Sequence, residues 1–589
     1  MSSVLMFISM SSRDCRAKKL DSKVRPSKAT RPQPRATAPH RRVDLGACAP
    51  KHARHARRIT MALRALVRPL RHAKVCTRAL STITTGNINP AVLNAEYAVR
   101  GELIMRATAI KQEMASNPSA VPFDKLVECN IGNPQALQQQ PVSFNRQVLS
   151  LMMCPQLLEM PGADAMFPAD VRARAREYLN AIPNGVGAYS ESQGFGIVRQ
   201  QVADFITERD GGIPAVGATL SNKRELATAA PCPASDAPAL ACHLSQNKDD
   251  IFLTDGASKG VGFILSLLLR GRSDGVLVPI PQYPLYSATL ALQEAHMLGY
   301  ELDENDGWAL PTAKLEAKLE KAKADGVETR CLVVINPGNP TGNSLPYKNM
   351  VEVVKFCAKH KLVLMADEVY QENVYDDALP FYSFKKVLEE MNPRPNLELV
   401  SLHSTSKGFL GECGLRGGYF ELVGFDKDVQ AQLLKLISIG LCSNTLGQIA
   451  TGLMVRPPTS GEASHNTYVS ERDAILSSMK RRATKLVAGL NSLEGVSCNQ
   501  PQGAMYAFPQ ITLPAKAIAA AEAAGKVPDT FYALALLEET GIVVVPGSGF
   551  GQVPGTWHFR TTFLPPEEEM EAVVERMGKF HKAFMAKYA

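Results

Sequence analysis

The sequence predicts an α/β fold with a mostly parallel central sheet in a large domain and a smaller α+β domain at the C-terminus. Between residues 250 and 410, short continuous apolar runs alternate with polar loops and helical stretches. Strands buried on both faces of a parallel sheet have this pattern. After about residue 425, long helical stretches precede short, isolated strand candidates. With 589 residues, the chain is long enough for two or three domains.

Five apolar runs of the large domain are the predicted strands of its sheet. They are DIFLT, GVLVPI, RCLVVI, KLVLMA and LELVSL, at residues 250–254, 275–280, 330–335, 361–366 and 397–402. Each runs into a polar, Gly- or Pro-marked loop: DGASKG, PQYPLY, NPGNPTG, DEVYQENVY and HSTSKG, in that order. Ligands bind outside the carboxyl ends of such strands. We therefore expect a single site built from these loops.

The C-terminal part predicts a smaller domain of mixed helices and strands. Helical patterns cover 429–442, 471–495 and 567–588, and strand candidates lie at 504–509, 541–546 and 557–563. The predicted organisation is a leader at 1–80, an N-terminal arm and linker at 81–170, a large domain at 171–424 and a small domain at 425–589.

Residues 1–80 form a basic leader. They contain 20 Lys and Arg and 3 Asp, which gives this segment a net charge of +17. Since the whole chain has a net charge of +8, residues 81–589 have a net charge of −9. From Met61, MALRALVRPLRHAKVCTRALST contains no acid and is rich in Arg, Ala and Leu, which is typical of an organellar transit peptide. We expect targeting to the mitochondrial matrix, ahead of plastid or cytosol. A nucleic-acid-binding arm is the alternative, and Met1 and Met61 are both candidate starts.

Residues 218–247 interrupt the passage from the large domain's first helices to its first predicted strand. This Ala-, Pro-, Ser- and Cys-rich stretch shows neither a helical nor a strand period. We interpret it as a poorly ordered surface insertion or an artefact of the gene model.

Composition excludes several other classes of protein. The twelve cysteines form no CxxC pair and no Cys/His cluster at zinc spacing, so we expect free thiols and no metal site. No uninterrupted apolar run approaches 18 residues, so we expect a soluble protein with no membrane partner. The acidic body offers no basic patch for nucleic acid.

The segment STSKGFLGECGLRGG places Lys407 among serines and glycines, with Arg416 nine positions on. Each loop has an ordinary structural interpretation: DGASKG as a turn, Asp367 as a cap or an ion-pair partner, Lys407 and Arg416 as solvated side chains. Together they hold a complete chemical set. A lysine forms an imine with an aldehyde, a helix N-terminus and an arginine hold a phosphate, and a buried carboxylate keeps a pyridine nitrogen protonated. This set predicts pyridoxal 5'-phosphate bound through a lysine.

From about residue 90 to the C-terminus, apart from 218–247, the chain resembles the fold-type I aminotransferases, and within them the alanine aminotransferase group. Eight segments carry the resemblance in order: NIGNPQALQQQPVSFNRQVLSL, GAYSESQGFGIVRQ, FLTDGAS, PIPQYPLYSATL, VVINPGNPTG, ADEVYQENVY, STSKGFLGECGLRGGY and FRTTFLP. The resemblance implies transfer of an amino group from L-alanine to 2-oxoglutarate, giving pyruvate and L-glutamate through pyridoxamine phosphate. Both substrates are small molecules.

The resemblance also implies roles for individual residues. Lys407, Asp367 and Tyr370 would be catalytic: Lys407 forms the Schiff base with the cofactor and then moves a proton, and Asp367 pairs with the pyridine nitrogen. The other implied cofactor contacts are Tyr370 and Asn339 at the phenolic oxygen, Tyr283 on the ring face, and Ala257, Ser258, Ser404 and Arg416 at the phosphate.

Substrate contacts and assembly are implied in the same way. Arg560 would bind the substrate α-carboxylate bidentately, aided by the backbone of Gly132. Tyr189 would reach the phosphate of a neighbouring subunit, which implies a homodimer with shared active sites. Lys259, next to the predicted phosphate cradle, could contact the phosphate or point to solvent.

Other functions stay open at this point. Glutamate–glyoxylate aminotransferase is the nearest alternative. A lyase of the aminocyclopropane-carboxylate synthase type would keep Lys407 and the cofactor, but it would transfer no nitrogen to 2-oxoglutarate. A binding protein that has kept the fold without the cofactor is an alternative from another class; such proteins usually lose the lysine or the phosphate ligands.

Overall fold

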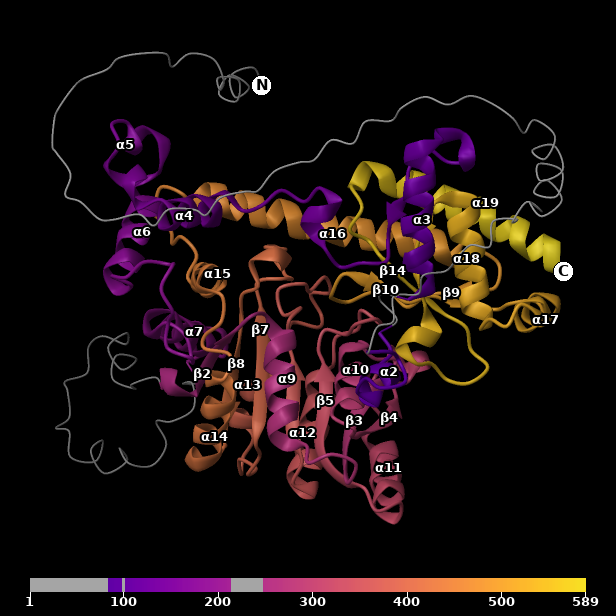
Figure 1. Cartoon of the computed structure of the whole chain (residues 1–589), viewed down its shortest axis with the longest axis horizontal. Helices are drawn as coiled ribbons and strands as arrows, with labels where there is room; N and C mark the ends of the chain where they lie inside the picture. Colours follow the sequence, from indigo (N-terminus) through magenta and orange to yellow (C-terminus); the bar gives the residue numbers. More distant parts are fainter. Residues whose placement is uncertain (1–82, 98–100, 213–246) are drawn as a thin grey trace, which may run out of the picture. The chain divides into compact units, whose positions relative to one another are not determined.

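The computed structural model describes residues 83–97, 101–212 and 247–589. The predicted leader at 1–80 and, except for Asn247, the predicted insertion at 218–247 lie outside these residues. A seven-stranded sheet is the central element (Figure 1). Its strand order is β2 (Ile251–Thr254), β8 (Gly418–Val423), β7 (Leu399–Ser404), β6 (Val363–Asp367), β5 (Glu328–Ile335), β3 (Asp274–Ile280) and β4 (His296–Glu301).

The sheet is mostly parallel, as predicted. Strands β7, β6, β5, β3 and β4 run parallel to one another. Strand β8 is antiparallel to both of its neighbours, β2 and β7. Sequence reasoning located five of the seven strands and missed β4 and β8. The segment of β8, GYFELV, directly follows the glycine-rich stretch around Arg416 and was not among the predicted strands.

Helices cover the two faces of the sheet because neighbouring residues of each strand point to opposite sides. On one face, Leu332 and Val334 of β5 pack with α11, α12 and α13. On the other face, Cys331 and Val333 of the same strand pack with α9, α10 and α14. The α-helices are α2 (Pro90–Asn94), α3 (Glu102–Ser116), α4 (Ser143–Met153), α5 (Ala163–Met166), α6 (Ala169–Ala181), α7 (Gly196–Arg209), α9 (Ala257–Leu268), α10 (Leu285–Leu292), α11 (Thr312–Ala324), α12 (Tyr347–His360), α13 (Phe384–Glu390), α14 (Lys427–Ser438), α15 (Thr445–Val455), α16 (His465–Asn491), α17 (Ala515–Ala523), α18 (Pro528–Thr540) and α19 (Met570–Tyr588).

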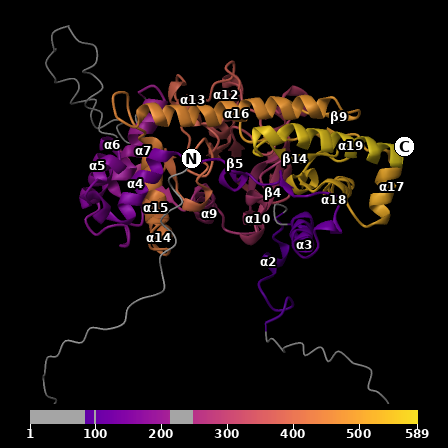
Figure 2. The ribbon, with the colours of Figure 1, turned by 90° about the horizontal axis from the view of Figure 1, so that it is seen from above.

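A second core joins the C-terminal elements to the N-terminal arm. Side chains of α3 pack with those of α16, α18 and α19, and Figure 2 shows α16 and α19 side by side. The short sheets here are β1 (Val127–Glu128) with β12 (Ile542–Val543), β10 (Tyr506–Ala507) with β14 (Phe559–Thr562) and β13 (Val545–Pro546), and β11 (Gln510–Ile511) with β9 (Val496–Ser497). The arm therefore contributes a strand and a helix to the C-terminal core, a contact that sequence reasoning did not foresee.

Helices α14 and α15 follow the predicted domain boundary at residue 424, yet they pack with the large sheet. Leu433 and Ile437 of α14 belong to the core on one face of the sheet. Ile449 and Leu453 of α15 pack with α4, α6, α7 and β2. Both helices thus pack with elements that precede residue 424 in the chain. The division into domains stays a prediction. Among the described residues, no helix is long and apolar enough to cross a bilayer.

Candidate active site

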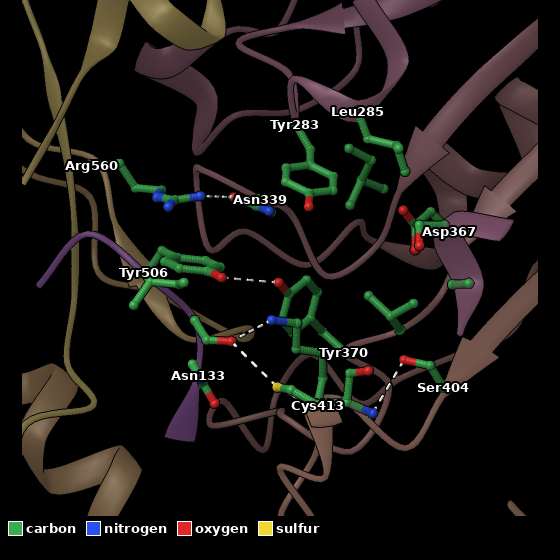
Figure 3. Close-up of a pocket in the computed structure, with 18 of the residues that line it drawn as sticks. Asn133, Tyr283, Leu285, Asn339, Asp367, Tyr370, Ser404, Cys413, Tyr506 and Arg560 are labelled. Atoms are coloured by element: carbon green, nitrogen blue, oxygen red, sulfur yellow. Dashed lines mark hydrogen bonds between the residues drawn. The ribbon is translucent and has the colours of Figure 1, made fainter. Parts of the chain in front are cut away.

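A cavity of about 450 Å³ lies at the carboxyl ends of β6 and β7, between the large sheet and the C-terminal core. Parallel strands bring the loops at their carboxyl ends to one edge of the sheet, which is why distant segments meet here. The predicted site residues that line this cavity are Gly132, Ala257, Ser258, Tyr283, Asn339, Asp367, Tyr370, Ser404, Lys407, Arg416 and Arg560. Figure 3 shows several of them pointing into a common space.

Lys407 lies three residues beyond the end of β7. Its Nζ donates to the backbone oxygen of Gly132 over 2.7 Å and lies 5.8 Å from the centre of the Tyr370 ring. A Cβ on residue 132 would come within 2.0 Å of the Tyr506 hydroxyl and 2.9 Å of Lys407 Nζ. Only glycine therefore fits at position 132, and its carbonyl orients the amine of Lys407 toward the cavity.

Asp367, the last residue of β6, is 5% exposed and has one free oxygen. Its Oδ2 accepts a hydrogen bond of 2.8 Å from the Tyr286 hydroxyl, whereas Oδ1 is buried and has no partner among the described residues. Burial raises the pKa of Asp367 to about 6, and the Tyr286 hydrogen bond opposes that rise. A buried acceptor without a donor is costly, so Oδ1 is suited to a cationic N–H donor that enters the cavity.

The N-terminus of α9 and the loop before β8 form a cradle for an anion. Arg416 Nη2 lies 3.5 Å from Ser258 Oγ and donates to the backbone oxygen of Asp255 over 2.6 Å. A Cβ on Gly256, where φ is +81°, would come within 2.7 Å of that same Nη2. Arg416 itself has φ of +55°, an uncommon conformation for a non-glycine residue that often marks a functional position. Helix dipole, backbone N–H groups and guanidinium all favour a phosphate here.

Arg560, on β14, is a buried cation on the opposite wall of the cavity (Figure 3). It is 2% exposed. Its Nη1 donates to Asn339 Oδ1 over 3.1 Å, and its Nη2 donates to the backbone oxygen of Asn130. The guanidinium carbon lies 4.3 Å from the centre of the Tyr506 ring, while Nε is buried without a partner among the described residues. A guanidinium held in this way is suited to bind a carboxylate.

Four tyrosines line the space between Lys407 and Arg560. The hydroxyls of Tyr370 and Tyr506 are 3.3 Å apart, and those of Tyr283 and Tyr97 are 2.9 Å apart. Burial on its own would raise the pKa of Tyr506, but the positive charges of Lys407 and Arg560 outweigh it and lower that pKa. The two cations thus make this hydroxyl a stronger hydrogen-bond donor.

Two residues discussed from the sequence lie away from this cavity. Tyr189 does not line it and is 78% exposed. Lys259, in the first turn of α9, is exposed and does not line it either. The structure therefore places Lys407, and not Lys259, next to Asp367 and Tyr370.

Sequence reasoning missed several residues of the site. Tyr97, Tyr286, Cys413 and Tyr506 were not predicted, although Tyr286 contacts Asp367 and the other three line the cavity. Tyr286 lies three residues after Tyr283 in PQYPLY, a segment already predicted to belong to the site, so the sequence could have indicated it. Tyr97 comes from the N-terminal arm and Tyr506 from a two-residue strand, and neither local sequence points to a site.

Two adjacent buried carboxyls predict how the stability of the cofactor-free protein changes with pH. Burial raises the pKa of Asp367 to about 6 and that of Glu368 to about 7. Both folded-state values lie above the unfolded ones, so the fold binds these protons more tightly than the unfolded chain. The resulting stabilisation is complete below pH 4 and is lost as the pH rises through 6 to 7. Its size is on the order of 2–3 kcal/mol per carboxyl.

The variant Glu368→Gln tests this dependence because it removes one titrating group. We expect urea unfolding of the cofactor-free protein to show that this variant gains stability relative to wild type between pH 5 and pH 8, by about 2–3 kcal/mol. Glu320→Gln, at an exposed position of α11, is the matched control and should follow wild type. A Glu368→Gln variant whose free energy of unfolding runs parallel to that of wild type over this range would contradict the expectation.

Comparisons with known proteins agree with this geometry. Residues 168–577 match the family described as aminotransferase class I and II. The chain is 53% identical over 513 residues to a probable mitochondrial alanine aminotransferase of Dictyostelium discoideum, covering 86% of this chain and 90% of that protein. It is 45% identical to glutamate–glyoxylate aminotransferase 2 of Arabidopsis thaliana, covering 87% of this chain and 98% of that protein.

Solved structures give the same fold at lower sequence similarity. The alanine aminotransferase of Pyrococcus furiosus superimposes with a TM-score of 0.63 at 22% identity, covering 84% of this chain and 100% of that one. An aminotransferase from Escherichia coli superimposes with a TM-score of 0.62, also at 22% identity, covering 86% and 100%. At this identity the likeness establishes the fold alone.

Proposed function

The chain belongs to the class I and II aminotransferases, and we propose that it transfers the amino group of L-alanine to 2-oxoglutarate, giving pyruvate and L-glutamate. It is a transaminase that depends on pyridoxal 5'-phosphate. The observation that carries the proposal is the single cavity in which Lys407, the unpaired Oδ1 of Asp367 and the guanidinium of Arg560 meet. The choice of alanine is supported by relatives named alanine aminotransferase at 48% to 53% identity.

The residues of the cavity fit this cofactor. Asp367 Oδ1 offers a buried acceptor to the protonated pyridine nitrogen, and Ala257, Ser258, Ser404 and Arg416 surround the place suited to the phosphate. Tyr370 and Asn339 would hold the phenolic oxygen, and Tyr283 would cover one face of the ring. When bound, the cofactor supplies an aldehyde carbon for the amino group and a ring that withdraws electrons.

The protein's own residues would orient the substrate and move its proton. Arg560 would bind the α-carboxylate of the amino acid, and the backbone of Gly132 would assist it. Lys407 Nζ would take the proton from the substrate Cα, and Tyr370, whose hydroxyl contacts Tyr506, would help to hold that amine in place. The aromatic walls exclude water while this happens.

A coupled assay tests the substrate assignment. We expect the protein starting near residue 81, supplied with pyridoxal phosphate, to release pyruvate from L-alanine only when 2-oxoglutarate is present. Glyoxylate with L-glutamate is the parallel reaction, because relatives at 45% identity carry the name glutamate–glyoxylate aminotransferase. An enzyme that turns over L-glutamate with glyoxylate, but not L-alanine with 2-oxoglutarate, would have that second activity instead. Release of products in the absence of any keto-acid acceptor would indicate a lyase.

The same family membership leads us to propose a homodimer with shared active sites. Tyr189 supports this, because it is exposed and contributes nothing to the cavity of its own chain. A second copy could bring its Tyr189 to the phosphate cradle. Light scattering should give twice the chain mass, and a monomer that is fully active would contradict the proposal.

We also propose that the protein resides in the mitochondrial matrix. Relatives from Dictyostelium discoideum, Arabidopsis thaliana and Saccharomyces cerevisiae carry the word mitochondrial in their names, and the basic, acid-poor segment from Met61 supports the same location. Residues 61–90 fused to a fluorescent protein should enter mitochondria. Cytosolic or plastid fluorescence would contradict the proposal.

A further inference from the structure

A second cavity, of about 580 Å³, is lined in part by His558. One wall is the turn that follows β4, including Glu304 and Trp308, and the other wall comes from the C-terminal strands, including Phe508 and His558. His558 precedes Arg560 by two residues. His558 forms a bridge with Gln510 directly before β14, and residues two apart in extended backbone point to the same side, as the side chains of His558 and Arg560 should.

Both ring nitrogens of His558 face hydrogen-bond acceptors. Nε2 lies 3.1 Å from Glu304 Oε2, and Nδ1 lies 3.0 Å from Gln552 Oε1. The orientation of the Gln552 amide is fixed, because its Nε2 donates to Asp529 Oδ2 over 2.8 Å. The oxygen of Gln552 must therefore accept from Nδ1. His558 is 2% exposed, so both contacts are made in the interior of the fold.

Asp529 supports this assignment because its carboxylate accepts from several donors. The backbone N–H of Ser548 donates to Oδ2 over 2.7 Å and the Ser548 hydroxyl donates to Oδ1 over 2.9 Å. With Gln552 as a third donor, both oxygens of the Asp529 carboxyl group accept hydrogen bonds, which fixes the orientation of the Gln552 amide. Only this orientation lets the Gln552 amide donate to Asp529 and accept from His558.

Glu304 is held by the C-terminal elements as well as by His558. Its backbone oxygen accepts from Asn499 Nδ2 over 2.9 Å, and its Oε2 lies 3.4 Å from Gln510 Nε2. Since Glu304 follows β4 of the seven-stranded sheet, the pair of Glu304 and His558 ties the large sheet to the strand that carries Arg560.

An aromatic stack continues from His558 to the guanidinium of Arg560. The Phe508 ring lies parallel to the His558 ring, with centres 4.8 Å apart and planes 3° apart. Phe508 meets Phe550 edge to face at 5.9 Å, and the Arg560 guanidinium carbon lies 4.7 Å from the centre of the Phe550 ring. A shift of His558 would thus displace the surface on which Arg560 rests.

We propose that His558 is a positioning residue for Arg560: its ring, paired with Glu304 across the second cavity, fixes the stack that aims the guanidinium at the substrate carboxylate. This inference rests on the proposed role of Arg560. Loss of the pair would weaken carboxylate binding and leave the proton transfer at Lys407 intact, because Lys407 belongs to a different loop. The effect would fall on KM for both substrates, and kcat at saturation would change little.

The test compares His558→Gln, Glu304→Gln and Arg560→Lys in the cofactor-loaded enzyme. Propionate, an unreactive carboxylate with the carbon skeleton of alanine, is titrated into each variant, and its binding is followed through the cofactor's absorbance. We expect His558→Gln and Glu304→Gln each to weaken propionate binding by about 3- to 30-fold. His360→Gln is the matched control, because His360 also pairs with a glutamate, Glu316, but lies on α12 away from the cavity.

Two further readouts separate positioning from general damage. In the Arg560→Lys background, His558→Gln should cause little additional loss of propionate binding, because both changes act on one interaction. In protein labelled with ¹⁵N-histidine, the ring signal of His558, assigned by its loss in His558→Gln, should change in Glu304→Gln because the two side chains are paired. These readouts do not require alanine turnover, so a failure of the proposed substrate leaves them informative.

The outcomes divide clearly. Loss of propionate binding that vanishes in the Arg560→Lys background, together with a His558 ring signal that changes in Glu304→Gln, supports the inference. An unchanged His558 signal in Glu304→Gln, losses that add fully to that of Arg560→Lys, or a wild-type enzyme that binds no propionate would each overturn it. A fall in kcat with unchanged KM would also overturn it, since that pattern belongs to the proton-transfer machinery.

Discussion

Replacing Lys407 with alanine is expected to lower kcat/KM for L-alanine and 2-oxoglutarate by about 10³- to 10⁴-fold. A positioned acid–base group contributes up to about 10⁴-fold, and the cavity-lining residues of the described chain include no second lysine that could replace it. The variant should fold and still bind pyridoxal phosphate without a covalent bond, because the phosphate cradle around Arg416 is unchanged. Initial rates in the coupled assay and the absorbance of the bound cofactor measure both expectations.

Lys259→Ala is the matched control for this experiment. Lys259 is exposed in the first turn of α9, close in sequence to the phosphate cradle but outside the cavity. Its replacement should leave kcat/KM within about threefold of wild type, the range of an ordinary surface change. If Lys259→Ala abolished turnover while Lys407→Ala kept more than a tenth of the wild-type rate, the assignment of the catalytic lysine would be wrong.

Replacing Asp367 with asparagine is expected to lower kcat by about 10²- to 5 × 10³-fold. Removing one partner of a buried charge pair costs about 3–5 kcal/mol, and each 1.36 kcal/mol corresponds to a factor of ten. Asparagine keeps the shape and can still accept from Tyr286, but it lacks the negative charge that keeps a pyridine nitrogen protonated. Single-turnover rates with L-alanine isolate this effect from the second substrate.

Glu368→Gln serves as the control for Asp367. Glu368 is the next residue and is also a buried carboxyl, but its oxygens accept from Ser401 Oγ and from the backbone N–H of Phe384, and it does not line the cavity. Its single-turnover rate should stay within about threefold of wild type. Equal losses in the two variants would mean that charge burial in general, and not a contact with the cofactor, determines the rate.

Much of the candidate site could be predicted because its residues lie in loops directly after apolar strands. Asp367 follows KLVLMA, Ser404 and Lys407 follow LELVSL, and Ser258 follows DIFLT. The carboxyl ends of neighbouring parallel strands meet at one edge, so local sequence and a single rule of sheet topology bring these groups together. The match to aminotransferase class I and II over residues 168–577 supports the same fold.

The antiparallel strand β8 shows where local pattern was insufficient. Its apolar run belongs to a strand that is antiparallel to both neighbours, and its pairing with β2 joins residues about 165 positions apart, which no local pattern reports. The same limit explains α14 and α15, whose apolar faces gave no indication of which core they would join.

The sequence by itself determined the chemistry of this protein: the lysine, the carboxylate, the arginines and the strand ends that present them. Only the tertiary structure decided which groups have no partner among the described residues, such as Asp367 Oδ1, and which are held in pairs, such as Glu304 with His558. The physical reason is that the composition and the hydrophobic periodicity of a sequence depend on residues that are neighbours within one helix or strand. Burial and hydrogen bonding depend on segments such as 303–308 and 557–560, which lie 250 residues apart in the chain and meet only when the fold forms.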